Sequence, residues 1–554
     1  MLHRTNLRKF AIEQPMPNSL FTPFHPSDVL TPYFIMLSKV NTSAVNGLSA
    51  MPVFLEVNCQ QLHAQDATSL YFMVGLPDNA VRESKLRVEN ALLSSGVKLP
   101  DRMKFTINFA PADVRKEGSG YDLPLALGLM ASVGQVPAEK LSRYVLVGEL
   151  GLDGSIRPIK GALSIAIKAR EQQYEGLIVP RDNVREAAVV NKLKVYGADH
   201  LQQVIDFFKG EDSLQPTLVN TREEFYAAQS QFPFDFADVK GQQSVKRAFE
   251  VAAAGGHNIM LIGAPGCGKS MMAKRLPGIL PRLTLAESLE TTQIHSVAGK
   301  LGAETSLVAQ RPFRSPHHTI SDVALIGGGT SCKPGEISLA HNGVLFLDEL
   351  PEFSRTALET LRQPLEDREI TISRSKYTVT LPCSFMLVAS MNPCPCGYYN
   401  HPTHECKCSP AQILKYKNRI SGPLLDRIDI QVEVTPVSVA DLAQAPAGEP
   451  SSVIRERVVA ARQRQTERYS AFRGIHCNAQ MTRAMLETYA RPDADGAAVL
   501  ERAMHRLDLS ARAYDRILKV ARTIADLDAS EAVLERHIKE AVNYRNLDRG
   551  SWGE

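Results

Sequence analysis

The chain has 554 residues, which is more than a single hydrophobic core normally organises, and this length predicts roughly two to four domains. Its composition is typical of a globular protein, with 44% hydrophobic and 22% charged residues. A net charge of +3 neither requires nor excludes nucleic acid, so any DNA-binding surface must be local. No run of about 18 apolar residues is present, so no membrane-spanning helix is expected.

The first 35 residues differ in composition from the rest of the chain. They are rich in proline, phenylalanine and threonine and have no hydrophobic period. We interpret residues 1–35 as a loosely ordered extension, or as sequence read from an early start, because a second methionine comes next at Met36. The basic residues near the beginning precede no apolar segment, so we expect no secretory signal and a cytoplasmic location.

Residues 36–209 alternate between strand-like and helix-like segments and predict a first domain. Strands are expected near residues 51–57, 71–78, 104–109 and 144–150, and helices near 78–90 and 123–130. The next segment is polar and lacks an apolar period, so residues 210–233 are expected to form a linker. A second α/β domain is predicted over residues 234–434, with a charged helical lid after it over 435–554.

The sequence GAPGCGKS at residues 263–270 comes after an apolar run and precedes a helix-like segment. Strand, glycine-rich turn and helix start, in that order, are the context that a phosphate-binding P-loop requires. Lys269 is expected to reach the β- and γ-phosphates of ATP, and the Ser270 hydroxyl to hold Mg²⁺. The residues expected to contact the nucleotide are Gly263, Ala264, Pro265, Gly266, Cys267, Gly268, Lys269, Ser270 and Met271.

Polar side chains end two further buried-strand patterns. Asp348 and Glu349 come directly after GVLFL, so Asp348 is expected to complete the Mg²⁺ shell and Glu349 to polarise the attacking water. Asn392 comes after the apolar run FMLVASM and is expected to orient that water or sense the γ-phosphate, the alternative being an ordinary turn residue. Together these motifs predict ATP hydrolysis.

Two inserts lie between and beyond these motifs. Residues 369–381 have β-rich halves around Arg374 and Lys376 and predict a hairpin with a basic tip. The thiols of Cys394, Cys396, Cys406 and Cys408 lie on a loop rich in glycine and proline, and four soft ligands can close around structural Zn²⁺. A set of three cysteines with His401 or His404 is the alternative.

Residues 418–430 read NRISGPLLDRIDI, and with the motifs above they resemble the AAA+ ATPases, in the clade of magnesium-chelatase motor subunits and MCM helicases. The resemblance implies that Arg427 is an arginine finger that acts on the nucleotide of a neighbouring protomer. It also implies that Arg512, in LSARAYDRIL, is a second sensor that contacts the γ-phosphate in cis. A finger acting in trans implies a closed ring, expected to be a homohexamer.

Three segments of the first domain narrow the resemblance. VGLPDNAVRESK (74–85), YDLPLAL (121–127) and VGELGLDGSIRPI (147–159) are similar to the ComM/YifB family, which are magnesium-chelatase-like ATPases with a Lon-protease-like domain. The implied fold is α/β: an AAA+ P-loop NTPase core with a helical lid, preceded by an α+β domain of the Lon-protease type (ribosomal protein S5 domain 2-like).

The catalytic pair of Lon-type proteases is not expected here. Such enzymes pair a serine with a lysine that activates it. In the resemblance Gly120 takes the position of the serine, with Ser119 one residue early. Leu163 takes the position of the lysine, and Lys160 comes too soon. The first domain is therefore expected to be a platform for assembly or DNA binding.

The resemblance further implies a ring-shaped helicase or translocase that promotes branch migration in homologous recombination during natural transformation. In that clade the hairpin projects into the pore of the ring, so Arg374 and Lys376 are expected to contact the phosphate backbone of DNA. Two alternatives stay open at this point: the motor subunit of a metal-chelatase-type complex, and an ATP-dependent protease.

Overall fold

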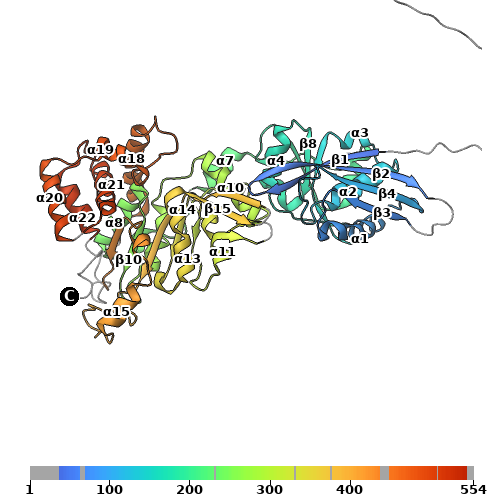
Figure 1. The fold of residues 1–554 in the computed structure, drawn as a ribbon. Coiled ribbons are helices and arrows are strands. Elements are labelled where there is room, and N and C mark those ends of the chain that lie inside the picture. Colours follow the sequence, from blue (N-terminus) through green and yellow to red (C-terminus); the bar gives the residue numbers. More distant parts are fainter. Residues whose placement is uncertain are drawn as a thin grey trace, which may run out of the picture.

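A computed structural model describes residues 37–62, 69–211, 213–229, 232–329, 332–374, 377–436, 448–507 and 509–545, with the side chains of Arg374 and Tyr377 excepted. The extension predicted for residues 1–35 therefore lies outside the described residues, as does Lys376. Figure 1 shows an elongated molecule, with the first domain at one end, the helical lid at the other and the P-loop sheet between them.

The first domain is built on a mixed sheet with the strand order β3-β4-β2-β1-β5-β8-β9. The long strands β1 and β2 are antiparallel and β2 continues into an antiparallel pair with β4, whereas β5, β8 and β9 are parallel. The strands are β1 (Leu37–Asn46), β2 (Ser49–Gln61), β3 (Leu70–Val74), β4 (Met103–Ala110), β5 (Tyr144–Leu146), β8 (Gly176–Pro180) and β9 (Lys194–Ala198). A small pair, β6 (Glu149–Leu150) and β7 (Ile156–Arg157), lies apart from this sheet.

Helices complete the first domain by covering its apolar surfaces. The expected helix near residues 78–90 is present, and the Asp78 side chain begins it by accepting a hydrogen bond from the Val81 N–H at 2.8 Å. The helix expected near 123–130 is buried along its length, which explains its continuous apolar sequence. The helices are α1 (Asn79–Ser94), α2 (Asp122–Ser132), α3 (Ala138–Leu141), α4 (Ala162–Glu171), α5 (Val184–Ala188) and α6 (Leu201–Lys209).

The second domain has the parallel strand order β11-β14-β17-β10-β18, which is the arrangement expected of an AAA+ core. The strands are β11 (Phe313–Arg314), β14 (Val344–Leu347), β17 (Met386–Met391), β10 (Ile259–Ile262) and β18 (Ile430–Glu433), and β10, β14 and β17 are buried along their whole length. Because all these strands point the same way, the P-loop, Asp348 and Asn392 lie past their carboxyl ends at one edge of the sheet.

Helices and two hairpins surround this sheet. The helices are α8 (Gln243–Gly255), α9 (Lys269–Ala273), α10 (Leu285–Ala298), α11 (Asp322–Ile326), α12 (Glu336–Leu339), α13 (Arg355–Thr360), α14 (Arg362–Asp367), α15 (Pro410–Lys417) and α16 (Gly422–Leu425). The short hairpin pairs β12 (Gly327–Gly328) with β13 (Lys333–Pro334). The predicted basic hairpin is present as β15 (Glu369–Arg374) and β16 (Tyr377–Pro382), which pair antiparallel directly after α14.

The predicted linker is more ordered than its polar sequence indicated. It contains helix α7 (Thr221–Ala228), whose Phe225 side chain is buried against the first domain. The Gln229 side chain donates a hydrogen bond to the Leu283 carbonyl of the second domain at 2.8 Å, and Arg185 pairs with Glu224 at 2.9 Å. One buried phenylalanine and a few polar contacts therefore fix this helix at the junction of the domains, and such isolated contacts produce no apolar period.

The C-terminal region is helical, as expected. It comprises α18 (Ser451–Arg468), α19 (Arg483–Tyr489), α20 (Ala494–Arg506), α21 (Ala511–Leu527) and α22 (Glu535–Asn543). Helices α18 and α21 pack on α8, so the lid and the P-loop sheet share one hydrophobic core. Among the described residues, no helix combines the length and apolar character that crossing a membrane requires.

Candidate nucleotide-binding and hydrolysis site

The P-loop joins strand β10 to helix α9. Gly266 and Gly268 adopt φ of +79° and +93°, which side-chain-bearing residues rarely tolerate. At Gly263 a Cβ atom would lie 2.4 Å from the Val434 carbonyl oxygen, so this position has no room for a side chain. The loop has the conformation that turns backbone N–H groups and the N-terminus of α9 toward a phosphate group.

Lys269 is the central cation of this loop. Its side chain is only 8% exposed, and its ammonium group donates to the Gly263 carbonyl at 2.7 Å, the Ala264 carbonyl at 2.9 Å and the Asn392 side-chain oxygen at 3.1 Å. Burial lowers the pKa of Lys269 from its ordinary value, against the nearby charge of Asp348. Two residues predicted to act on the γ-phosphate therefore touch each other across neighbouring strands.

The predicted magnesium ligands also lie together. The Ser270 hydroxyl donates to Asp348 Oδ2 at 2.7 Å, and the Ser390 hydroxyl donates to Asp348 Oδ1. Ser390 was not predicted; its signal was a serine inside the otherwise apolar strand β17, where it is fully buried. A hydroxyl and a carboxylate at the mouth of a P-loop are the ligands that Mg²⁺ prefers, so the donor set fits this ion.

Glu349 lies at the same edge with an unusual backbone. Its φ is +54°, which is uncommon for a residue other than glycine and typical of functional positions. Its backbone N–H donates to Ser390 Oγ at 3.4 Å, and one carboxylate oxygen lies 3.5 Å from His318 Nδ1. The exposed carboxylate thus projects beside the magnesium ligands, and His318 is a further polar neighbour that the sequence did not indicate.

The outer residues of the loop differ in their surroundings. Cys267 is half-buried, with its sulfur 3.9 Å from the Lys269 ammonium group. Met271 is 42% exposed on α9, so it borders the site from outside. Pro265 lies against Gly397 of the cysteine-rich loop, where a Cβ atom would be 2.5 Å from the proline ring.

Arg427 lies at the opposite edge of the sheet from the P-loop. It precedes β18, which runs parallel to β10, whereas the P-loop comes after β10. Four residues of strand separate the two edges by about 13 Å. The Arg427 guanidinium donates to the Pro423 carbonyl at 2.7 Å and to the Glu366 carboxylate. This position suits a finger that reaches a neighbouring protomer.

Arg512 does not lie where the sequence predicted. Its guanidinium is 3.9 Å from the Asp426 carboxylate, and it lines the same cleft of about 160 Å³ as Arg427. The physical reason is the packing of α21, which begins at this edge and holds Asp429 through Arg516 at 2.5 Å. In this conformation the Arg512 guanidinium therefore lies away from the P-loop of its own protomer, whereas the resemblance implied a γ-phosphate contact in cis.

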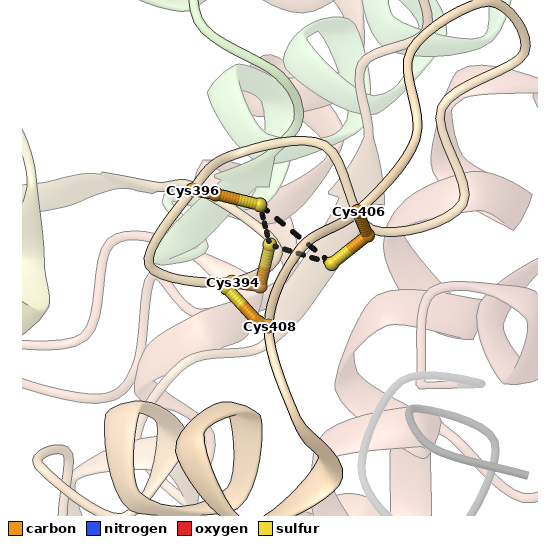
Figure 2. Close-up of side chains that lie close together, drawn as sticks. All are labelled: Cys394, Cys396, Cys406 and Cys408. Atoms are coloured by element: carbon orange, nitrogen blue, oxygen red, sulfur yellow. Dashed lines mark hydrogen bonds between the residues drawn. The ribbon is translucent and has the colours of Figure 1, made fainter.

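The four cysteines converge as predicted. Their sulfurs all lie within 4.8 Å of one another, with Cys394 3.3 Å from Cys396 and 3.7 Å from Cys406 (Figure 2). A tetrahedral zinc site with Zn–S bonds of about 2.3 Å separates its sulfurs by about 3.8 Å. The sulfur separations therefore fit Zn²⁺. The four cysteines form this group of candidate ligands without His401 or His404, whose rings pack on Tyr398.

The serine and lysine of the first domain are far from a protease arrangement. Ser119 donates its hydroxyl hydrogen to the Glu149 carboxylate. Leu163 is buried, and Lys160 lies across Gly299 of the second domain. The partner of the serine hydroxyl is thus an acid rather than an amine, which is the opposite of what a Ser–Lys pair needs.

Protein-family models match the first domain, the P-loop domain and the lid of this chain. Residues 235–442 match the family model "Magnesium chelatase, subunit ChlI", residues 61–183 match "Subunit ChlI of Mg-chelatase", and residues 448–545 match "Magnesium chelatase, subunit ChlI C-terminal". The uncharacterized protein YifB of Escherichia coli is 44% identical over 93% of this chain and 98% of its own.

Two further relatives extend this comparison. The competence protein ComM of Haemophilus influenzae is 41% identical over 93% of this chain and 98% of its own length. Lon protease 2 of Bacillus subtilis is 28% identical over 26% of this chain and 28% of its own. The matches to YifB and ComM span both domains and the lid, so the chain belongs to the ComM/YifB family of magnesium-chelatase-like AAA+ ATPases.

Proposed function

We propose that this protein is an ATP-driven, ring-shaped DNA translocase or helicase that promotes branch migration in homologous recombination during natural transformation. Membership of the AAA+ family supports ATP hydrolysis, and the name of the Haemophilus relative links that protein to competence. The observation that carries the ring is the placement of Arg427 and Arg512 at the sheet edge opposite the P-loop.

Each side chain then has a role in one composite site. Lys269 exchanges its carbonyl partners for phosphate oxygens, and Ser270 and Asp348 hold Mg²⁺, which supplies charge neutralisation when bound. Glu349 accepts a proton from the attacking water, which Asn392 orients. Arg427 of a neighbouring protomer, joined by Arg512, neutralises the charge that develops on the transferred phosphoryl group, an effect worth about 10³–10⁵ in rate.

The DNA contacts belong to the same proposal. The hairpin begins at Glu369, three residues after Glu366, and Glu366 at the end of the short helix α14 is the partner of Arg427. The same short segment therefore contacts the finger and leads into the hairpin. Arg374 ends β15, and we propose that Arg374 and Lys376 contact the DNA backbone without reading sequence. Structural zinc on the four cysteines would stiffen the loop beside Pro265.

Mixing two inactive variants tests the composite site. Lys269→Ala removes the phosphate-binding lysine and Arg427→Ala removes the finger, and each should abolish hydrolysis alone. In rings mixed at equal concentrations, on the order of a quarter of the sites combine an intact P-loop with an intact finger and regain activity. Mixtures as inactive as their components, or full activity of Arg427→Ala alone, would reject a site shared between protomers.

The chelatase motor is the second candidate, because all three matching family models describe a magnesium-chelatase subunit. The two functions differ in what stimulates hydrolysis. A DNA translocase hydrolyses ATP faster with single-stranded or forked DNA, whereas a chelatase motor responds to its partner enzyme. The protease alternative lacks support from the contacts of Ser119 and Lys160.

A further inference from the structure

The junction between the two domains gathers three lysines from three separate segments. Lys160 lies in the turn between β7 and α4, where Gly161 has φ of +76° and donates its N–H to the Ser296 carbonyl of α10 at 3.1 Å. The Lys160 side chain then crosses the end of α10: a Cβ atom on Gly299 would lie 2.8 Å from Lys160 Cε and 3.2 Å from its Cδ. Lys300 is the next residue of that segment.

Lys333 belongs to a third segment of the chain. It begins β13, which packs against α10, and its charge is the largest influence on Lys160. The charge of Lys333, together with burial and the charge of Lys300, lowers the pKa of Lys160. All three side chains are exposed, and among the described residues none of the three forms an ion pair with a carboxylate.

Helix geometry explains only part of this arrangement. The C-terminus of α10 carries partial negative charge, which favours a basic residue such as Lys300 or Lys160 beside it. That field falls off within one helical turn and does not account for a third cation, Lys333, beside Lys160. Like charges brought together without an acid are unfavourable unless an anion joins them.

The segments packed around Lys160 and Lys333 indicate the class of anion that the three lysines bind. At Gly327, beside Lys333, a Cβ atom would lie 2.9 Å from the Ile372 side chain of β15. At Gly47, in the turn between β1 and β2, it would lie 2.6 Å from Val379 of β16. The hairpin proposed to contact DNA therefore packs against the segment of Lys333 and against the β1–β2 turn. That turn lies beside Lys160, because a Cβ atom on Gly161 would lie 2.9 Å from the Val45 side chain at the end of β1.

We propose that Lys160, Lys300 and Lys333 form a phosphate-binding seam that contacts the DNA backbone where it leaves the hairpin of β15 and β16. This inference rests on the proposed DNA function and adds a contact made jointly by the two domains. Ammonium groups recognise phosphodiesters as point charges, so the seam binds any sequence. It also gives the first domain a direct part in holding DNA.

The test is the salt dependence of DNA affinity in the full-length protein. Lys160, Lys300 and Lys333 are replaced together by alanine, and binding of a fluorescent single-stranded oligonucleotide is followed by anisotropy over a series of salt concentrations. Each lost phosphate contact should reduce the slope of log K against log salt by about 0.7, or about 2 for the triple variant. DNA-independent ATP hydrolysis should stay unchanged.

A matched triple variant controls for net charge. Lys98 and Lys539 are exposed and Lys168 is half-buried, and the three pair with Asp101, Glu535 and Glu171 respectively. Replacing all three should leave the slope as in the natural sequence. Melting temperature separates binding from a structural role. Because the seam lysines repel one another, their removal should leave Tm unchanged or raise it.

The outcomes distinguish this inference from the proposed function. If the natural sequence binds DNA and the seam variant keeps its slope, the seam is rejected while the DNA function stands. A lower Tm with an unchanged slope would also reject it and assign the lysines to the helix terminus. If the natural sequence binds no DNA, both the seam and the proposed function fall.

Discussion

Glu349 combines an exposed carboxylate with a left-handed backbone at the tip of β14. We expect Glu349→Gln to keep ATP affinity, because the amide has the same shape, and to lower the hydrolysis rate about 10²–10⁴-fold, because it cannot accept a proton. Fluorescent nucleotide binding and phosphate release measure the two effects separately. Rapid hydrolysis by this variant would remove Glu349 from its role as base.

Glu366 holds the proposed finger in its present position. Its carboxylate accepts from Arg427, whose side chain is 12% exposed and also bonds the Pro423 carbonyl. We expect Glu366→Gln to raise the rate of hydrolysis without DNA and so to reduce stimulation by DNA, because the arginine is released more easily. The same phosphate-release assay with and without DNA measures this ratio.

A neighbouring pair gives the control for Glu366. Glu359 accepts from Arg362 at 2.9 Å on the adjoining helical turns, and among the described residues its ion pair is with Arg362, whereas that of Arg427 is with Glu366. Glu359→Gln should therefore leave both rates unchanged. Equal basal rates in Glu366→Gln and the natural protein would show that the ion pair does not restrain the finger.

One buried carboxylate joins helix α21 to the sheet, in addition to the hydrophobic core that they share. Asp429 is 1% exposed; it accepts from Arg516 at 2.5 Å and from the Asn258 N–H at 3.0 Å, with His257 Nδ1 at 3.5 Å. Burial opposes ionisation, but Arg516 and His257 outweigh it and hold the pKa of Asp429 well below its usual value. The lid therefore depends on an ion pair at the edge of the P-loop sheet.

We expect Asp429→Ala to destabilise the protein by about 3–5 kcal/mol, because it leaves Arg516 without its buried partner. Since the folded pKa is depressed, the contribution of Asp429 is present above its unfolded pKa of 3.8 and is lost as pH falls below it. Denaturant unfolding across an acid pH series measures both effects. A variant as stable as the natural protein, with the same acid sensitivity, would contradict this role.

The cysteine-rich loop packs on the P-loop through Gly397 and Pro265. We expect about one zinc ion per chain, lost when Cys406 and Cys408 are replaced by serine, because two sulfurs cannot complete a tetrahedral site. Elemental analysis measures the metal, and nucleotide binding should weaken with it as the loop loosens. Replacing the buried Cys59 is the matched control. Natural protein purified without zinc, yet binding nucleotide normally, would overturn the assignment.

At the scale of the molecule, hydrolysis should require assembly. Because Arg427 and the P-loop occupy opposite edges of one sheet, an isolated protomer holds the proposed finger away from its own site. We expect the hydrolysis rate per chain to rise with protein concentration and to parallel the ring fraction seen by mass photometry. A monomeric preparation with full activity would reject the shared site.

Local patterns predicted the parts of the site that depend on neighbouring residues in the chain. The P-loop, Asp348, Glu349 and Asn392 each come after a buried strand, and parallel strands bring such ends together. The side of the sheet that Arg512 occupies depends instead on how α21 packs, which its own amphipathic pattern does not encode. The same holds for Ser390 and His318, whose partners lie on other segments, and for α7, which one buried phenylalanine fixes.

In the proposed ring, the separation of the edge that carries Arg427 from the edge that carries the P-loop gives the assembly a rotational sense. In a closed circle of such subunits, every subunit serves the neighbour on one side and is served by the neighbour on the other. One defective guanidinium then silences a single adjacent site and leaves the remainder intact. If ATP is hydrolysed at successive sites around such a circle, the direction of that sequence is fixed by the polarity of one parallel sheet.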